Sequence, residues 1–120
     1  MTLRFEAEVV RCAEAIGGDI LQVKFDSEDQ EDKDGRRNPY VLIGQCFEFP
    51  GPPTIEWHDG TDYDGGANLR SIVLRRNAVE IITNSGFGFD IRFSLTNARY
   101  EELAAFIRKI FPNTKVLDTA

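Results

Sequence analysis

The chain has very little of the residue chemistry from which most active sites are built. Its 120 residues include one histidine, His58, and two cysteines, Cys12 and Cys46, which lie too far apart for a CxxC metal or redox motif. A GxSxG nucleophile motif is missing, and GFGFD at 86–90 lacks the third glycine of a dinucleotide-binding fingerprint. These absences favour a binding protein over an enzyme, and they predict no metal site and no cofactor.

Long apolar runs are also missing, and so is an excess of positive charge. No run approaches the roughly 20 apolar residues that span a bilayer, and charged residues interrupt the N-terminal MTLRFEAEVVR. We therefore expect no membrane segment and no secretory signal, and the cysteines fit small core residues in a reducing cytoplasm. Asp and Glu exceed Lys and Arg by 20 to 14, giving a formal charge of -6. This balance disfavours nucleic acid as a partner and favours a cationic one.

Apolar periodicity predicts one α+β domain over residues 1–120. Alternating or buried apolar patterns indicate strands over 3–12, 20–25, 40–47, 55–58, 69–74, 78–83 and 88–94, and a reversing loop over DGTDYDGG at 59–66. A helix follows Thr96 as N-cap, with an apolar face of Leu103, Phe106, Ile107 and Ile110, and ends before Pro112. The prediction is a mainly antiparallel, twisted sheet of about six to seven strands. The C-terminal helix packs on one face, and a flexible tail covers 113–120.

The first candidate site is an acidic loop over residues 26–39. Its segment DSEDQEDKD holds six carboxylates and one lysine, and the connection is longer than a chain reversal requires. The loop is either a solvated connection or a surface that docks onto a basic cleft. Its glycine does not have the spacing of a calcium-binding EF-hand. The predicted partner-binding residues of this loop are Glu28, Asp29, Glu31, Asp32 and Asp34.

The second candidate site is the segment EWHDGTDY, which gathers the only tryptophan and the only histidine among acids. A large aromatic ring among charges is a common anchor for a protein partner. The other interpretation is that Trp57 packs at the edge of the core while His58 is a surface residue. A general-base role for His58 lacks a nucleophile nearby in sequence. The predicted partner-binding residues here are Glu56, Trp57, His58, Asp59, Asp62 and Tyr63.

The order of these features resembles a known family over about residues 40–112. A strand YVLIGQCFE, the YDGG at 63–66 before a strand hairpin, and the strand FGFDIRFSL leading into the helix RYEELAAFIRKIF are its shared elements. In this order they resemble the predicted bacterial immunity proteins of the tenth immunity family. Members of that family are small α+β proteins encoded beside polymorphic or contact-dependent toxins. The resemblance implies that the chain binds and neutralises such a toxin inside the producing cell.

The residues and the resemblance lead to the same hypothesis, a non-enzymatic immunity protein. The acidic loop and the segment around Trp57 would cover the basic active site of a cognate protein toxin, which is the expected partner of a monomer or homodimer. Two alternatives stay open. One is a small-molecule-binding or minor enzymatic domain with a pocket near His58, beneath the loop at 59–66. The other is a structural oligomer whose strand edges pair between subunits.

Overall fold

A computed structural model describes residues 2–27, 39–48, 51–60 and 63–117. The fold is α+β with a mainly antiparallel sheet and one helix in the described residues, as predicted, but the sheet has nine strands rather than six or seven. The elements, in chain order, are β1 (Thr2–Glu6), β2 (Val9–Ala15), the single 3₁₀ turn η1 (Ile16–Gly18), β3 (Ile20–Asp26), β4 (Tyr40–Cys46), β5 (Thr54–His58), β6 (Tyr63–Arg75), β7 (Ala78–Thr83), β8 (Gly88–Arg92), α1 (Asn97–Ile110) and β9 (Lys115–Leu117).

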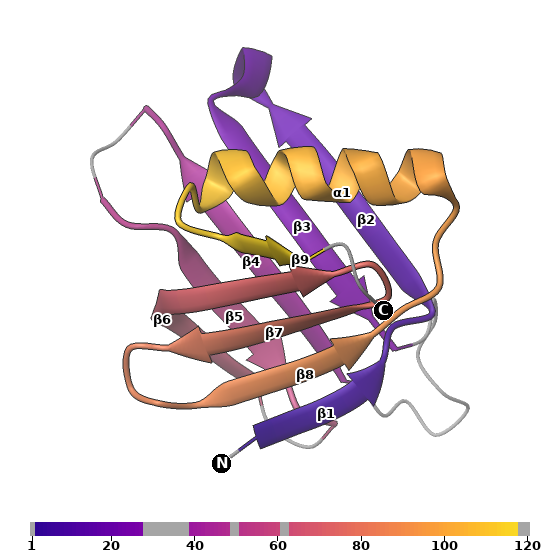
Figure 1. The fold of residues 1–120 in the computed structure, drawn as a ribbon. Coiled ribbons are helices and arrows are strands. Elements are labelled where there is room, and N and C mark those ends of the chain that lie inside the picture. Colours follow the sequence, from indigo (N-terminus) through magenta and orange to yellow (C-terminus); the bar gives the residue numbers. More distant parts are fainter. Residues whose placement is uncertain (1, 28–38, 49–50, 61–62, 118–120) are drawn as a thin grey trace.

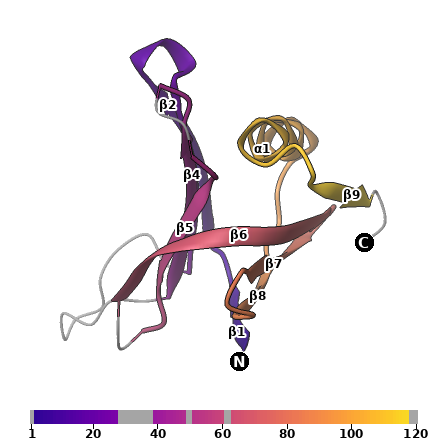
Figure 2. The same cartoon turned by 90° about the vertical axis from the view of Figure 1, so that its left-hand side faces the viewer.

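The sheet consists of two halves that share the long strand β6. The strand order is β1-β8-β7-β6-β5-β4-β3-β2, and β9 lies beside β6 (Figure 1). The beginning of β6 pairs with β5, whereas its end pairs with β7 and β9. Figure 2 shows β6 passing from one half into the other, with α1 in the angle between them. The helix packs mainly against β3, with further contacts to β2 and β4.

The first predicted strand, 3–12, is in fact two strands at opposite ends of the sheet. β1 pairs in parallel with β8, whereas β2 pairs antiparallel with β3. The break follows a change in the apolar alternation, because inward positions are odd up to Ala7 and even from Val10 onward. The Ala7 amide donates to the Arg92 carbonyl at 2.7 Å and ends the pairing of β1. One alternating segment thus supplies both outer strands of the sheet.

The YDGG segment is part of a strand and not of the predicted loop, because β6 already begins at Tyr63. The register between β5 and β6 shifts by one residue between the pairs Ile55–Ala67 and Trp57–Asp64. Gly66, with φ of 81°, lies within this β-bulge. A positive φ is readily adopted only by glycine, so the bulge requires glycine at this position.

The chain after α1 contains a short strand that was not predicted. Lys115–Leu117 forms β9, parallel to the end of β6, and Val116 packs against the core. This differs from the flexible tail expected from residue 113, because an apolar residue in that segment reaches the sheet. The remaining residues, 118–120, lie outside the described part of the chain.

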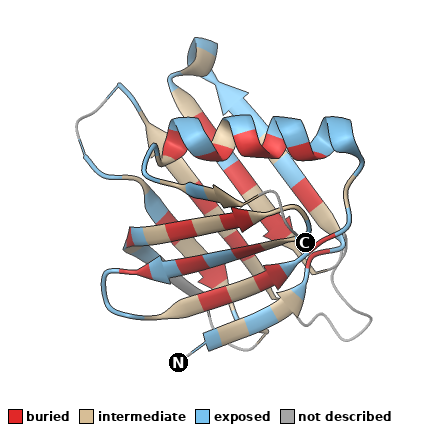
Figure 3. Cartoon of the chain, in the orientation of Figure 1, coloured by how far each residue is buried: buried red, intermediate tan, exposed pale blue. Residues whose placement is uncertain are grey.

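The helix covers the core with the face that its periodicity predicted, except at one position. The Thr96 hydroxyl accepts a hydrogen bond from the Arg99 amide at 3.3 Å and caps the helix, as predicted. Phe106, expected in the core, is only half-buried. In Figure 3 the buried positions of α1 line the side that faces the sheet; they are Tyr100, Leu103, Ala104, Ile107 and Ile110.

The helix is too short to cross a bilayer. It has 14 residues, and no helix in the described ranges is both long and apolar enough to span a membrane.

Candidate partner-binding surface

The strand ends that flank the two candidate sites lie side by side at one end of the sheet. Asp26 ends β3, Tyr40 begins β4, His58 ends β5 and Tyr63 begins β6, and each is paired in register with the next. The Ser27 amide donates to the Pro39 carbonyl at 3.0 Å across the base of the acidic loop. Two segments that are about 30 residues apart in sequence therefore leave the sheet side by side. The predicted loop residues Glu28, Asp29, Glu31, Asp32, Asp34 and Asp62 lie outside the described residues, as does the side chain of Tyr63.

A cation and two aromatic rings form a cluster at this end of the sheet, on the face that points away from the core, which we call the outer face. The Lys24 Nζ is 3.4 Å from a carboxylate oxygen of Asp26 and 4.8 Å from the ring centroid of Tyr40. The Tyr40 ring stacks on His58, with ring centroids 6.1 Å apart and an interplanar angle of 22°. Cation–π and stacking contacts hold these rings in place without burying them. His58 is therefore part of a half-exposed aromatic surface next to the predicted acidic loop.

The other predicted residues of β5 differ in exposure. Glu56 is half-buried on the outer face, paired with Leu42, and Asp59 is exposed just beyond the strand. Glu56 lies on the same face of the sheet as His58, and Asp59 directly follows His58 in the chain. They can contribute negative charge to a partner contact.

Trp57 has a packing role, and its predicted role as a surface anchor needs correction. Its side chain is only 5% exposed, because alternate residues of a strand point to opposite faces and Trp57 points into the core. Its ring centroid is 5.1 Å from that of Phe87 in a stacked pair and 5.0 Å from that of Phe89 in an edge contact. The candidate partner-binding surface therefore lacks the indole and retains the imidazole of His58 together with the carboxylates of Glu56 and Asp59.

The hydrogen bonding of His58 does not suit a general base. The Gly60 amide donates to Nδ1 at 3.0 Å, so Nδ1 serves as the acceptor in a neutral imidazole and Nε2 carries the proton. Neither nitrogen is then poised to accept a proton from a substrate. The described residues contain no group of three or more His, Cys, Asp or Glu that could hold a metal ion.

Two grooves on the outer sheet faces were not anticipated from the sequence. One, of about 300 Å³, lies over Gly44, where a Cβ would be 3.3 Å from the Leu21 carbonyl oxygen. The other, of about 580 Å³, lies on the β7–β8 half and is lined by three acids and two arginines: Glu6, Glu80, Asp90, Arg75 and Arg92. Arg4 lines a neighbouring groove that shares Asp90 with this one, and its Nε is 3.7 Å from a carboxylate oxygen of Asp90. This groove carries alternating charges that compensate one another, so it offers no single-sign surface. The period-2 charges of β1 and β8 were the sequence signal for it.

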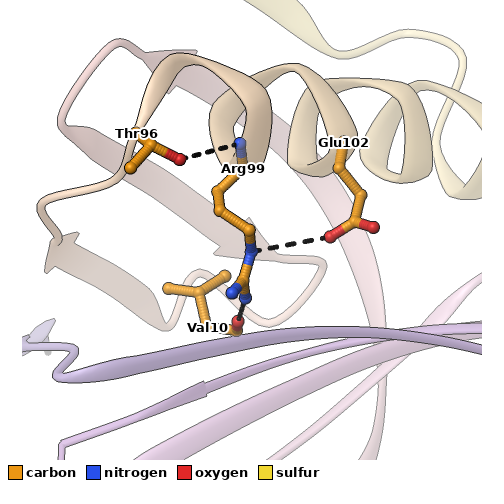
Figure 4. Close-up of polar contacts among 4 residues, drawn as sticks. All are labelled: Val10, Thr96, Arg99 and Glu102. Atoms are coloured by element: carbon orange, nitrogen blue, oxygen red, sulfur yellow. Dashed lines mark hydrogen bonds and ion pairs between the residues drawn. The ribbon is translucent and has the colours of Figure 1, made fainter.

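A polar cluster joins the start of α1 to the outer strand β2 (Figure 4). The guanidinium of Arg99 donates to the Val10 carbonyl at 2.5 Å, and its Nε is 3.7 Å from Glu102. Because β2 pairs only with β3, this carbonyl faces the free edge of the sheet. Arg99 therefore satisfies a backbone acceptor at an edge that sequence patterns do not identify.

Cys12, on β2, is partly buried against the core, and its thiol interacts electrostatically with Glu102 and Arg99 of this cluster. Burial raises the pKa of this thiol from 9.0 to about 11; the negative charge of Glu102 acts in the same direction, and the positive charge of Arg99 opposes it. The thiol is therefore protonated at neutral pH and only slowly reactive. Because the folded thiol keeps its proton to higher pH than the unfolded one, the associated stability is complete below pH 9 and is lost as the pH rises through about 11.

We expect Cys12 to react slowly with a thiol-specific disulfide reagent. In a Cys46→Ser background at pH 8, the folded protein should react about 100-fold more slowly than the protein in urea, because raising the pKa from 9.0 to about 11 lowers the thiolate fraction in that proportion. Glu102→Gln should raise the rate, since it removes a charge that disfavours the thiolate. Equal rates for folded and unfolded protein would contradict this assignment.

Comparisons with known proteins do not assign a family. No family model matches the chain, and no curated protein matches it. The resemblance to immunity proteins therefore rests on the sequence features described above.

Proposed function

We propose that this chain is a non-enzymatic immunity protein of the bacterial cytoplasm, which binds a basic protein toxin and covers its active site with an acidic surface. The observation that carries this proposal is that the two acidic segments leave the sheet at the same end. The acidic loop and the 59–62 connection both leave the same sheet end, beside the half-exposed Tyr40 and His58. The described ends of these two stretches, which are distant in sequence, therefore lie beside one another.

The described surface suits inhibition by binding. Inhibition requires a rigid platform, complementary charge and a few anchors, and it requires no catalytic group. The sheet is the platform, because β3, β4 and β5 are held on both sides by neighbouring strands. Tyr40 and His58 are half-exposed rings that stack on each other, and Lys24 lies over the Tyr40 ring. The formal charge of -6 supplies the attraction to a basic partner.

Co-expression with the protein encoded beside this chain tests the proposal. The neighbouring protein should be toxic when produced alone, and production of this chain should restore growth. The purified pair should form a stoichiometric complex in which the toxin has no activity. A neighbour that is harmless, or that stays active in the presence of this chain, would contradict an immunity function.

Neutralising the acidic loop should slow association with the toxin. Replacing Glu28, Asp29, Glu31, Asp32 and Asp34 by their amides removes long-range attraction, so we expect the association rate at low salt to fall about tenfold and to depend less on salt. Stopped-flow or biosensor measurements at several salt concentrations provide the comparison. The control neutralises Glu80, Glu101 and Glu102, which are exposed on β7 and α1. An equal loss per charge in loop and control variants would show that only net charge matters.

A further inference from the structure

Two of the three exposed large apolar side chains in the described residues lie at the end of the sheet opposite the acidic loop. Ile16 is 62% exposed at the tip of the β2–β3 hairpin, and Phe47, just after β4, is 49% exposed. A hydrogen-bond chain connects them, because Asp19 donates to the Ile16 carbonyl at 3.1 Å and accepts from the Phe47 amide at 2.6 Å. Figures 1 and 2 show this hairpin tip extending beyond α1. We call Ile16, Phe47 and the hairpin turn over residues 17–19 the apolar tip.

The backbone of the apolar tip is unfavourable for the residue that occupies it. Ile16 has φ of 54°, the only positive φ of a non-glycine residue in the described chain. A β-branched side chain crowds the backbone in this left-handed region, and Gly17 beside it adopts a similar φ of 64° without such a cost. An isoleucine that is both strained and exposed contributes little to folding. Strain of this kind is commonly found at functional positions.

The two segments that form the apolar tip carry only acidic charges. The tip segments 13–20 and 44–48 contain the three acids Glu14, Asp19 and Glu48, all exposed, and neither segment contains a lysine or arginine. A partner that accepts the two apolar side chains must therefore present positive charge around them.

The outer groove over Gly44 continues from the apolar tip. Ile20 and Cys46, which line the groove, are paired with each other and directly follow or precede the tip residues Asp19 and Phe47. The groove is also lined by Pro52. Apolar contact area thus extends from the tip onto the sheet face that leads to Tyr40 and His58.

We propose that the apolar tip is a second contact for the basic partner, and that Ile16 and Phe47 insert into an apolar recess bordered by lysine or arginine side chains. This inference rests on the proposed function. A single partner would contact the acidic loop at one end of β3 and β4, and the tip at the other end. The seven residues of β3 span about 23 Å, which is within the dimensions of an ordinary protein interface.

Substitutions at the tip separate binding from folding. Ile16→Gly removes the exposed side chain and relieves the backbone, so its unfolding temperature should equal or exceed that of the wild type. Phe47→Ala removes the second apolar side chain. Each substitution should weaken the complex with the purified, catalytically inactivated neighbouring toxin by about tenfold or more, as expected for an interface anchor. Ile82→Ala is the matched control, because Ile82 is 40% exposed but lies on β7; it should leave the affinity unchanged.

A separate variant tests the three acidic residues of the tip segments. Replacing Glu14, Asp19 and Glu48 by their amides should weaken the same complex and reduce its dependence on salt.

Binding measured by titration calorimetry distinguishes failure of the tip inference from failure of the proposed immunity function. If the wild type binds and Ile16→Gly and Phe47→Ala bind equally well, the tip inference is overturned while the immunity function stands. If the wild type itself does not bind, both are overturned. Light scattering of the chain alone tests whether a second copy of this chain contacts the tip instead. A wild-type dimer that becomes a monomer on Ile16→Gly would identify the tip as a contact between copies and would overturn the proposal.

Discussion

Replacing Trp57 with alanine is expected to lower the free energy of unfolding by about 3–5 kcal/mol, the usual cost of removing a buried aromatic side chain. The indole is 5% exposed and contacts the rings of Phe87 and Phe89. Each aromatic pair adds about 0.5–1.5 kcal/mol to the effect of burial alone. The collapse of this cluster would loosen the contact between β5 and β8, which lie in different halves of the sheet.

Two comparisons separate packing from partner binding at this position. Trp57→Phe keeps an aromatic ring in the core, so its destabilisation should be clearly smaller and its affinity for the proposed toxin partner should match that of the wild type. His58→Ala, one residue further along β5, alters the outer face and should change the free energy of unfolding by less than about 1 kcal/mol. Urea unfolding followed by far-ultraviolet circular dichroism measures all three variants. A Trp57→Ala variant as stable as the wild type would show that the indole is not packed in the core.

Replacing Arg99 with alanine is expected to lower the free energy of unfolding by about 1–2 kcal/mol. The substitution leaves the Val10 carbonyl, at the free edge of β2, without its donor from α1. A hydrogen bond from a charged donor contributes more than a neutral one, and the loss of one partner leaves the other with a desolvation cost. The start of the helix would also lose its polar connection to the strand beneath it.

Glu102→Gln is the matched control for Arg99. It removes the exposed ion pair and keeps the bond to Val10, so its effect should stay within about 0.5 kcal/mol. The edge of β2 should also become available for pairing in Arg99→Ala, because exposed strand edges associate. Light scattering at increasing concentration should therefore detect self-association in Arg99→Ala and none beyond the wild-type level in Glu102→Gln. Equal stabilities of the two variants would contradict the role assigned to the Val10 bond.

Periodicity located most of the regular elements but counted them incorrectly. The apolar alternation identified the strands that became β3, β4, β5, β7 and β8, and the helix began after Thr96 as its capping pattern indicated. The segment 3–12 was misassigned because the change of alternating phase near Glu8 resembles ordinary variation within one strand. β9 was missed because three residues carry too little pattern for a prediction, and its pairing depends on where β6 ends.

The candidate site was predictable only in part for a similar reason. Sequence proximity placed Trp57 with its charged neighbours, but the alternation of side chains in β5 turns Trp57 inward and leaves Glu56 and His58 outward. The contacts of His58 with Tyr40, and of Arg99 with Val10, join residues that are far apart in the chain. No local pattern specifies such pairs.

The sequence by itself determined the fold class, the position of the helix, the excess of negative charge and the scarcity of catalytic side chains, because composition and short-range periodicity are sufficient for these properties. Only the tertiary structure decided which segments share a surface. The register of β3, β4, β5 and β6 brings the ends of the two acidic segments together, and the hairpin geometry places Ile16 with Phe47 at the opposite end. Strand order and register depend on the simultaneous packing of all the strands around one core, and that packing is a property of the whole chain.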